Sequence, residues 1–198
     1  EETEKVNQLE TNLTQTMANH GQPKSIEILC FACYRQIHKY EWCSRIKLNS
    51  KLAEVEKRLI DDPITEKKLG KGIKSFGAIS QETSLKVKAQ YELNPYPRWE
   101  TVVMPPNPVS IKELVNGLKL RALIPNPRKK TKPQVLIAGC GTGKHSIRTA
   151  QRIKNCQVTA IDLSISSLSY AKRKTLEFGI KNIDHIQADL LDLQNLGK

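Results

Sequence analysis

The feature that most constrains the fold of this chain is a glycine-rich stretch at residues 135–146, VLIAGCGTGKHS. Its apolar start predicts a short buried strand, and the residues HSIRTAQRI that follow predict a helix. Gly139, Gly141 and Gly143 have no Cβ, so a ligand can approach the main chain closely beneath the N-terminus of that helix. The stretch therefore predicts a strand–turn–helix unit that holds a nucleotide-like ligand.

The same alternation of strand and helix continues to residue 198. A second strand is predicted at CQVTAIDL, a second helix at ISSLSYAKRKTLEFG with its stop at Gly179, and a third strand within IDHIQADLLDL. Alternating elements of this kind form parallel strands with right-handed crossovers. We therefore expect an α/β fold, a partial doubly wound (Rossmann-like) parallel sheet that follows an N-terminal α-helical region.

Two acidic residues stand at the ends of the predicted strands. Asp162 ends the second strand, roughly 20 residues after the glycines, where an acidic side chain can bind ribose hydroxyls. Asp189 ends the third strand. Open α/β sheets bind ligands at the carboxyl ends of their strands, so we interpret both as binding residues. A loop-capping role remains the alternative for each carboxylate.

The spacing of the glycines separates two kinds of cofactor. The dinucleotide fingerprint is G-x-G-x-x-G, but its last glycine would fall on Lys144, and the spacing here is G-x-G-x-G. With VLIAGCGTG, AIDLS and ADLLDL, the chain resembles the class I S-adenosylmethionine-dependent methyltransferases. With QYELNPYPRW as well, it is similar to a bacterial group of them often fused to helical or tetratricopeptide-repeat regions. The resemblance covers about residues 86–198.

The resemblance implies S-adenosyl-L-methionine as cofactor and assigns a role to each part of the site. The main chain of the loop would lie against the methionine part of the cofactor, Asp162 would hold the ribose with Leu163 against the adenine, and Asp189 and Leu190 would border the adenine and its amino group. The loop residues concerned are Ala138, Gly139, Cys140, Gly141 and Gly143. One residue departs from the family, because many members have Asp or Glu where this chain has Ile137.

The expected activity is methyl transfer from this cofactor. A sulfonium methyl group is already electrophilic, so the protein need only align an acceptor with it. In the resembled family the acceptor-facing residues follow the fourth strand, and we expect this chain to stop before them. We therefore predict no catalytic residue and leave the acceptor open among a small molecule, a protein and RNA. An inactive cofactor-binding fragment is an alternative, with the edge of the third strand exposed.

Three regions are expected along the chain. Residues 1–88 form a helical N-terminal region, in which residues 1–20 are a frayed helix or a disordered lead-in, residues 25–60 are helical and Pro63 ends the run. The stretch LGKGIKSFGAIS is expected to be a loop. Residues 89–132 form a proline-rich connector with a short helix after Ser110, and residues 133–198 form the incomplete cofactor-binding domain. Within the connector, Tyr96 and Trp99 either cover the pocket or pack as core.

A rival interpretation concerns four residues in the N-terminal region. Cys30, Cys33, His38 and Cys43 have the spacing C-x2-C-x4-H-x4-C and resemble a zinc knuckle of nucleic-acid-binding proteins. Tyr34 and Ile37, however, occupy places where a knuckle needs glycine. Ile26, Leu29, Cys33 and Ile37 also follow helical spacing, and a continuous helix cannot bring the four ligands to one point. We favour buried helical cysteines and predict no metal.

Composition limits the partners of the chain. The net charge is +12, which suits a nucleic-acid partner, but the basic residues are spread along the chain and only 5% of residues are aromatic. We therefore favour a lysine-rich surface over nucleic-acid binding, which stays the alternative. No apolar run is long enough to span a bilayer, no signal peptide opens the chain, and the five cysteines fit reduced thiols. We predict a cytoplasmic protein without a membrane partner.

Overall fold

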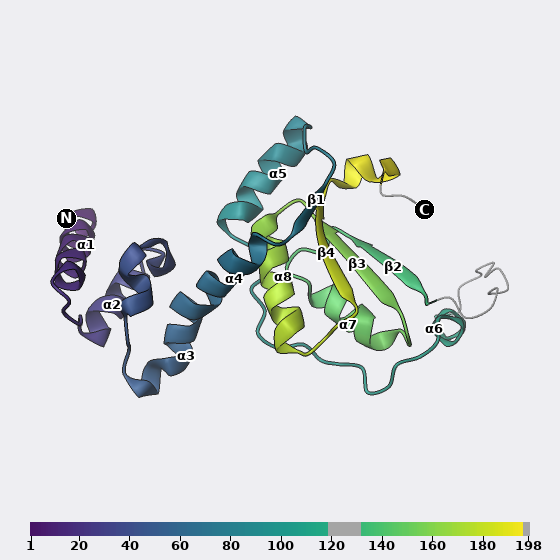
Figure 1. Ribbon diagram of the computed structural model, residues 1–198, viewed down its shortest axis with the longest axis horizontal. Coiled ribbons are helices and arrows are strands. Elements are labelled where there is room, and N and C mark those ends of the chain that lie inside the picture. The colour runs from purple at the N-terminus through teal and green to yellow at the C-terminus, as the bar shows by residue number, and fades with distance from the viewer. Residues whose placement is uncertain (119–131, 196–198) are drawn as a thin grey trace. The chain divides into compact units, whose positions relative to one another are not determined.

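The computed structural model of the chain describes residues 1–118 and 132–195 (Figure 1). The chain forms two compact units, Glu1–Thr65 and Glu66–Lys198. We expected residues 66–88 to belong with the N-terminal helices. They fall in the second unit because they contribute a strand to its sheet and most of a helix, α5 (Glu82–Leu93), that packs against helix α8 (Ile165–Glu177).

The first unit consists of short helical segments around an apolar core. Its helices are α1 (Glu2–Ala18), α2 (Ser25–Ala32) and α3 (Ala53–Glu56), with 3₁₀ turns at Ile37–Lys39, Glu41–Arg45 and Ser50–Leu52. The rings of Phe31, Tyr40 and Trp42 pack together in this core, with centroids 4.9 to 6.4 Å apart. Three contacting aromatic rings give this small unit a specific centre.

Of the two expectations for residues 1–20, the structure has the helix and not the disordered lead-in, and that helix packs into the core. Helix α1 buries Val6, Leu13 and Met17, which lie seven and four residues apart and so share one face. Leu9, partly buried, packs against the same core, and the stripe was missed because polar side chains fill most of the other positions. The expected stripe of Ile26, Leu29, Cys33 and Ile37 is wrong.

Helix α2 ends at Ala32 and buries Ile28 and Phe31, whereas Ile26 is 62% exposed. Apolar residues occur on every side of α2, so their periodicity did not select the buried face.

Pro63 lies inside a helix and does not end one. Helix α4 (Asp62–Gly70) has the proline as its second residue, and a π-helical turn at Lys57–Asp61 comes directly before it. Pro63 has no amide hydrogen to donate to the carbonyl four residues earlier, at Leu59, and that carbonyl lies inside the π-helical turn, where the regular α-helical hydrogen bonding already changes. The wide π turn then connects α3 to α4 without a break in helical backbone.

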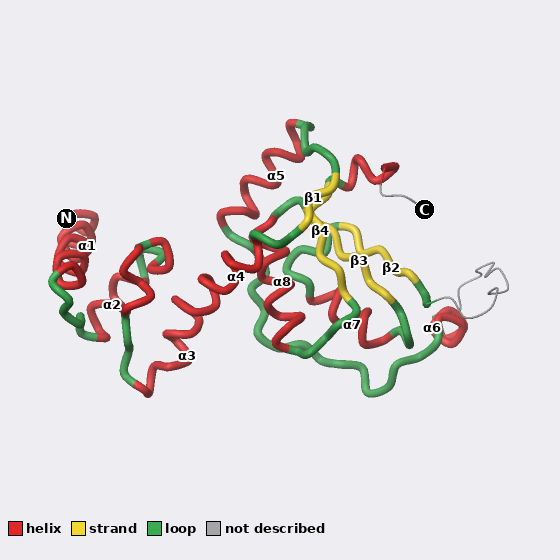
Figure 2. Tube along the Cα trace, viewed as in Figure 1, coloured by secondary structure: helices red, strands yellow, loops and turns green. Residues whose placement is uncertain are grey.

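The second unit contains a sheet of four parallel strands, shown in yellow in Figure 2. The strands are β1 (Lys74–Phe76), β2 (Gln134–Ala138), β3 (Gln157–Asp162) and β4 (Ile183–Ala188), and their spatial order is β1-β4-β3-β2. Strands β2, β3 and β4 confirm the predicted α/β alternation. The register places Ala138 opposite Ile161 and Asp162 opposite Gln187.

Strand β1 was not predicted, and it corrects two expectations. It lies within the stretch LGKGIKSFGAIS, which we expected to be a loop, and it pairs with β4 from Lys74↔Ile186 to Phe76↔Ala188. A strand of three residues beside Gly72 and Gly77 shows too little alternation to be detected. Because β1 covers β4, the edge of the third predicted strand is not exposed.

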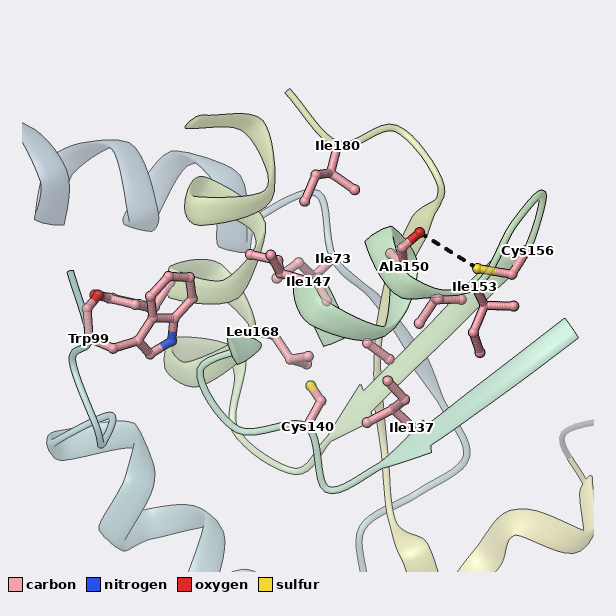
Figure 3. Close-up of a cluster of buried hydrophobic side chains, with 13 residues drawn as sticks. Ile73, Trp99, Ile137, Cys140, Ile147, Ala150, Ile153, Cys156, Leu168 and Ile180 are labelled. Carbon is pink, nitrogen blue, oxygen red and sulfur yellow. Dashed lines mark hydrogen bonds between the residues drawn. The ribbon is translucent and has the colours of Figure 1, made fainter. Parts of the chain in front are cut away.

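Two helices cover one face of the sheet. Helix α7 (Lys144–Arg152) joins β2 to β3, and α8 joins β3 to β4. Both crossovers step in the same direction across the sheet, so right-handed connections place both helices on the same side. The core between the helices and the sheet is shown in Figure 3. Its fully buried members include Ile147, Val158, Ala160 and Leu168.

The connector follows the predicted extended path and short helix over residues 94–117, whereas residues 89–93 belong to α5. Residues 94–110 follow an extended path to α6 (Ile111–Gly117). Ser110 caps this helix, since its Oγ accepts from Glu113 N at 3.2 Å and Glu113 Oε2 accepts from Ser110 N at 2.7 Å. The predicted linker PNPRKKTKP lies almost wholly outside the described residues. No helix in the described part of the chain is long and apolar enough to cross a membrane.

The core of the second unit can be tested on one helix. Leu168 is 0% exposed and Leu176 is 60% exposed, and both lie on α8. We expect Leu168→Ala to lower the free energy of unfolding by about 3 kcal/mol, because it leaves a cavity in the core. The matched change Leu176→Ala should lower it by less than about 0.5 kcal/mol. Urea unfolding measures both, and equal losses would contradict this packing.

The stability of the second unit should depend on pH through His185. This residue lies on β4 with its Nε2 3.4 Å from Thr175 Oγ1, and burial, helped by nearby Lys172, lowers its pKa to about 4. The folded state therefore disfavours the protonated ring. The free energy of unfolding should be highest above the pKa of the unfolded state, about 6.5. It should fall by at most about 3 kcal/mol as the pH drops towards 4.

Thermal unfolding between pH 4 and pH 7.5 checks this dependence. The variant His185→Gln should flatten the curve, whereas His145→Gln, at an exposed histidine, should leave it unchanged. An unchanged slope in His185→Gln would assign the pH dependence to another group.

Candidate functional site

The glycine loop after β2 is held in a conformation that favours glycine at three positions. Gly139, Gly141 and Gly143 have φ values of +69°, +53° and +82°. Cys140, between them, donates its amide to Ile161 O at 2.9 Å and so ties the loop to the end of β3. Because other residues adopt positive φ only with strain, the sequence here is fixed by the backbone.

The predicted partner of this loop, Asp162, lies beside it. Asp162 Oδ2 accepts from Gly141 N at 2.8 Å, and Asp162 Oδ1 accepts from Ser164 N at 3.0 Å. One carboxylate thus connects the turn after β2 to the turn after β3. A carboxylate has about four acceptor positions, so two hydrogen bonds leave capacity for a ligand. The structure shows the loop-capping role for Asp162, and its role in ligand binding stays a prediction.

The three glycines differ in what surrounds them. A Cβ on Gly141 would meet no atom within 4 Å, and one on Gly139 would meet only Leu190 Cδ1, at 3.6 Å. A Cβ on Gly143 would lie 2.5 Å from Ala171 Cβ on α8. Gly139 and Gly141 therefore border open space, whereas Gly143 is a buried N-cap of α7 that lets α8 pack closely.

The remaining predicted residues differ in how exposed they are. Ala138 is exposed at the end of β2, and Leu190 is 45% exposed next to Gly139. Leu163 is half-buried, and its carbonyl oxygen accepts from Gln187 Nε2 at 2.8 Å. Asp189 is 5% exposed, and its Oδ1 accepts from Leu191 N at 2.9 Å. The alternative of a loop-capping carboxylate thus describes what Asp189 does here.

Cys140 is unsuited to act as a nucleophile. Its thiol is buried, and burial together with the charge of Asp162 raises its pKa well above the ordinary value. The thiol therefore stays protonated, and only a thiolate is reactive. Cys140 contributes packing and its amide hydrogen bond to the loop.

A segment upstream of the sheet supports the glycine loop, which the sequence did not show. Thr142 Oγ1 donates to Pro97 O at 2.7 Å, and Trp99 Nε1 donates to Thr142 O at 3.0 Å. Trp99 is 7% exposed in the core, and its carbonyl oxygen accepts from Tyr170 OH. Of the two expectations for this segment, core packing is confirmed for Trp99, whereas Tyr96 is 74% exposed.

An ion-pair cluster holds the same segment against α8. Glu66 Oε1 lies 3.0 Å from Arg98 Nη2 and 2.9 Å from Arg173 Nε, and Glu66 and Arg173 are both buried. Both guanidinium groups also lie over the ring of Tyr170, 4.7 and 4.9 Å from its centroid. Hydrogen-bonded charges stacked on a ring define a single arrangement of the segment.

The N-terminus of α8, directly after Asp162 and Leu163, is capped by a distant carboxylate. Glu92 on α5 accepts from Ile165 N at 2.6 Å and from Ser166 N at 3.1 Å. Ser164 Oγ accepts the next amide, from Ser167 at 3.0 Å. Three of the first amide groups of α8 are thus satisfied by side chains, which also fixes the turn that carries Asp162.

The cap offers a direct test. We expect Glu92→Gln to lower the free energy of unfolding by about 1–2 kcal/mol, because an amide can accept through only one atom and carries no charge at the helix N-terminus. Glu82→Gln, on the same helix in an exposed pair with Lys86, should change it by less than about 0.5 kcal/mol. Equal effects of the two substitutions in thermal unfolding would contradict the capping role of Glu92.

The four residues of the rival zinc site are not brought together. Cys43 is buried in the core of the first unit, whereas Cys30 and Cys33 are exposed on and just after α2. Cys33 Sγ donates to Leu29 O at 3.3 Å. Within the described residues, no group of three or more His, Cys, Asp or Glu side chains is arranged to hold a metal ion. The expected burial of the helical cysteines is wrong for Cys30 and Cys33.

Comparisons with known proteins show what the region around the glycine loop is similar to. Residues 135–198 match a protein family described as "Methyltransferase domain". A "Probable (S)-tetrahydroprotoberberine N-methyltransferase 2" from Papaver bracteatum is 34% identical over 61 residues, which are 31% of this chain and 17% of that protein. This chain therefore spans only a small part of the length of that relative.

A solved structure adds a weaker similarity. It is described as "Conversion of a Disulfide Bond into a Thioacetal Group during Echinomycin Biosynthesis". The match covers 56% of this chain and 42% of the other, with 25% sequence identity and a TM-score of 0.34. Residues 135–198 are therefore similar to a methyltransferase domain.

Proposed function

We propose that the second unit of this chain binds S-adenosyl-L-methionine as part of a methyltransferase. The observation that carries the proposal is the pair formed by Gly141 and Asp162. The amide of Gly141 is fixed by the carboxylate at 2.8 Å, while the space that a side chain would fill is open. A ligand can thus lie against bare main chain and reach a carboxylate at the same point.

The residues present fit the adenosyl part of this cofactor. Asp162 keeps acceptor positions free beyond its two amide hydrogen bonds, which suits the paired hydroxyls of a ribose. Leu190, partly exposed beside Gly139, offers an apolar contact for a flat base, and Leu163 offers another. Gln187 fixes the main chain at Leu163, and Ser75 of β1 holds Gln187 through a hydrogen bond of 2.8 Å.

One position offers less than the resembled family provides. Ile137 is 7% exposed and packs in the core, so it presents no polar group to the amino group of the cofactor. Any polar contact there would have to come from the main chain of the loop. We therefore expect the affinity to depend on the adenosyl contacts more than on the methionine end.

When bound, the cofactor supplies a methyl group on a sulfonium centre, which is electrophilic without further activation. The residues of this chain would hold and orient the cofactor. The exclusion of water from the site would strengthen their polar contacts with it. We assign no catalytic residue and no acceptor, so a small molecule, a protein and RNA all remain candidates. A cytoplasmic location stays a prediction from the sequence.

A matched pair of glycines tests the proposal. Gly141 and Gly179 both have positive φ, +53° and +66°, and a Cβ on either would meet no atom within 4 Å. Alanine should therefore strain both backbones by a similar amount, about 1–2 kcal/mol. Only Gly141→Ala would place a methyl group in the proposed site. We expect it to raise the Kd for S-adenosyl-L-methionine at least about tenfold, with Gly179→Ala unchanged.

Isothermal titration calorimetry on the purified chain measures this, with NADH titrated in parallel. Equal affinity of the two variants for S-adenosyl-L-methionine would show that the glycine loop does not contact it. Heat with NADH, and none with S-adenosyl-L-methionine, would replace the proposal with a dinucleotide-binding function.

A further inference from the structure

A second hollow, apart from the residues of the proposed cofactor site, lies between α7 and the connector. It is a groove of about 560 Å³ with two unlike walls. Val103, Pro105 and Pro106 of the connector form an apolar wall, and Arg148 and Arg152 of α7 form a cationic one. In Figure 1 the connector runs past α7 on its way to α6, and Val109 bridges to Ile153 where α7 ends.

The cationic wall is available to a partner. Arg148 and Arg152 are exposed and lie four residues apart, on one face of α7. Within the described residues, neither arginine forms an ion pair with a carboxylate. The apolar wall is open as well, since Val103 is 83% exposed. A guanidinium group binds a carboxylate through two parallel hydrogen bonds, so this wall suits an acidic ligand.

The dimensions of the groove favour an extended peptide. Four residues of helix span about 6 Å, which is the separation of the two arginines along α7. Alternate residues of an extended chain lie about 6.6 Å apart and point to the same side. Acidic side chains at alternate positions would therefore meet both arginines. The residues between them would point to the opposite wall, where Val103 and the prolines offer apolar contact.

A nucleic acid fits these walls less well. Proteins that bind single strands stack the bases on aromatic side chains. Among the described residues that line the groove, the only aromatic ring is the imidazole of His145, and none is Phe, Tyr or Trp. Pro105 and Pro106 also lack the amide hydrogens that would bind phosphate oxygens on that side.

We propose that this groove binds an extended segment of a partner protein in which acidic and apolar residues alternate. The site does not depend on the cofactor, so it can be tested without one. The probe is a fluorescein-labelled peptide of eight residues that alternates Glu and Leu. Two control peptides replace all Glu by Gln, or all Leu by Ser. Fluorescence anisotropy at low salt measures the Kd of each peptide for the purified chain.

The expected results separate the two walls. The Glu–Leu peptide should bind, and each control peptide should bind at least about tenfold more weakly. The double variant Arg148→Gln/Arg152→Gln should weaken the Glu–Leu peptide at least about tenfold. The charge-matched control Lys67→Gln/Lys68→Gln, at exposed lysines on α4, should leave the Kd within about twofold.

A further variant tests the apolar wall, and a competitor tests the class of partner. Val103→Asp adds a carboxylate to an exposed position, so it should weaken the peptide without unfolding the chain. Equal binding to the native chain and the arginine variant, or no binding at all, would overturn the proposal. Tighter binding of a single-stranded oligouridylate, lost in the arginine variant, would overturn it in favour of a nucleic acid.

Discussion

The carboxylate of Asp162 joins the two turns from which the site is built. Its oxygens accept amides from Gly141 and Ser164, so the turn after β2 cannot move independently of the turn after β3. This contact depends on the register that places Ala138 opposite Ile161. A slip of one residue between the strands would turn Asp162 to the other face of the sheet, and the loop would lose its carboxylate.

The supports of the site come from chain segments far upstream. Pro97 and Trp99 hold the glycine loop through Thr142, Glu92 caps α8, and Ser75 holds Gln187 beneath Leu163. Each contact saturates a polar group that would otherwise compete with the ordering of a turn. The folded unit that carries the proposed site is therefore larger than the residues that match the methyltransferase family, because residues 74–99 complete its sheet edge, its helix cap and its core.

The difference between what was and was not predictable follows from sequence distance. Strands β2, β3 and β4, the glycine loop and its pairing with Asp162 were predictable because each has a local pattern and the βα alternation brings them together. Strand β1 and Glu92 were missed because they contact residues 112 and 73 positions away and have no periodicity of their own. The packing of helix α1 was missed for a different reason, since polar side chains outnumber apolar ones along it.

The loop itself shows that a glycine pattern can combine two physical demands. Gly139 and Gly141 border open space, so only they leave room for a ligand against the main chain. Gly143 begins α7 and contacts Ala171, so its missing side chain lets α8 approach the loop. Ser164, the N-cap of α8, donates its amide to Asp162, so the position of α8 is connected to that of the carboxylate. The third glycine therefore affects the site through helix packing. The spacing G-x-G-x-G is explained by the close approach of α8 as well as by the room that a ligand would need.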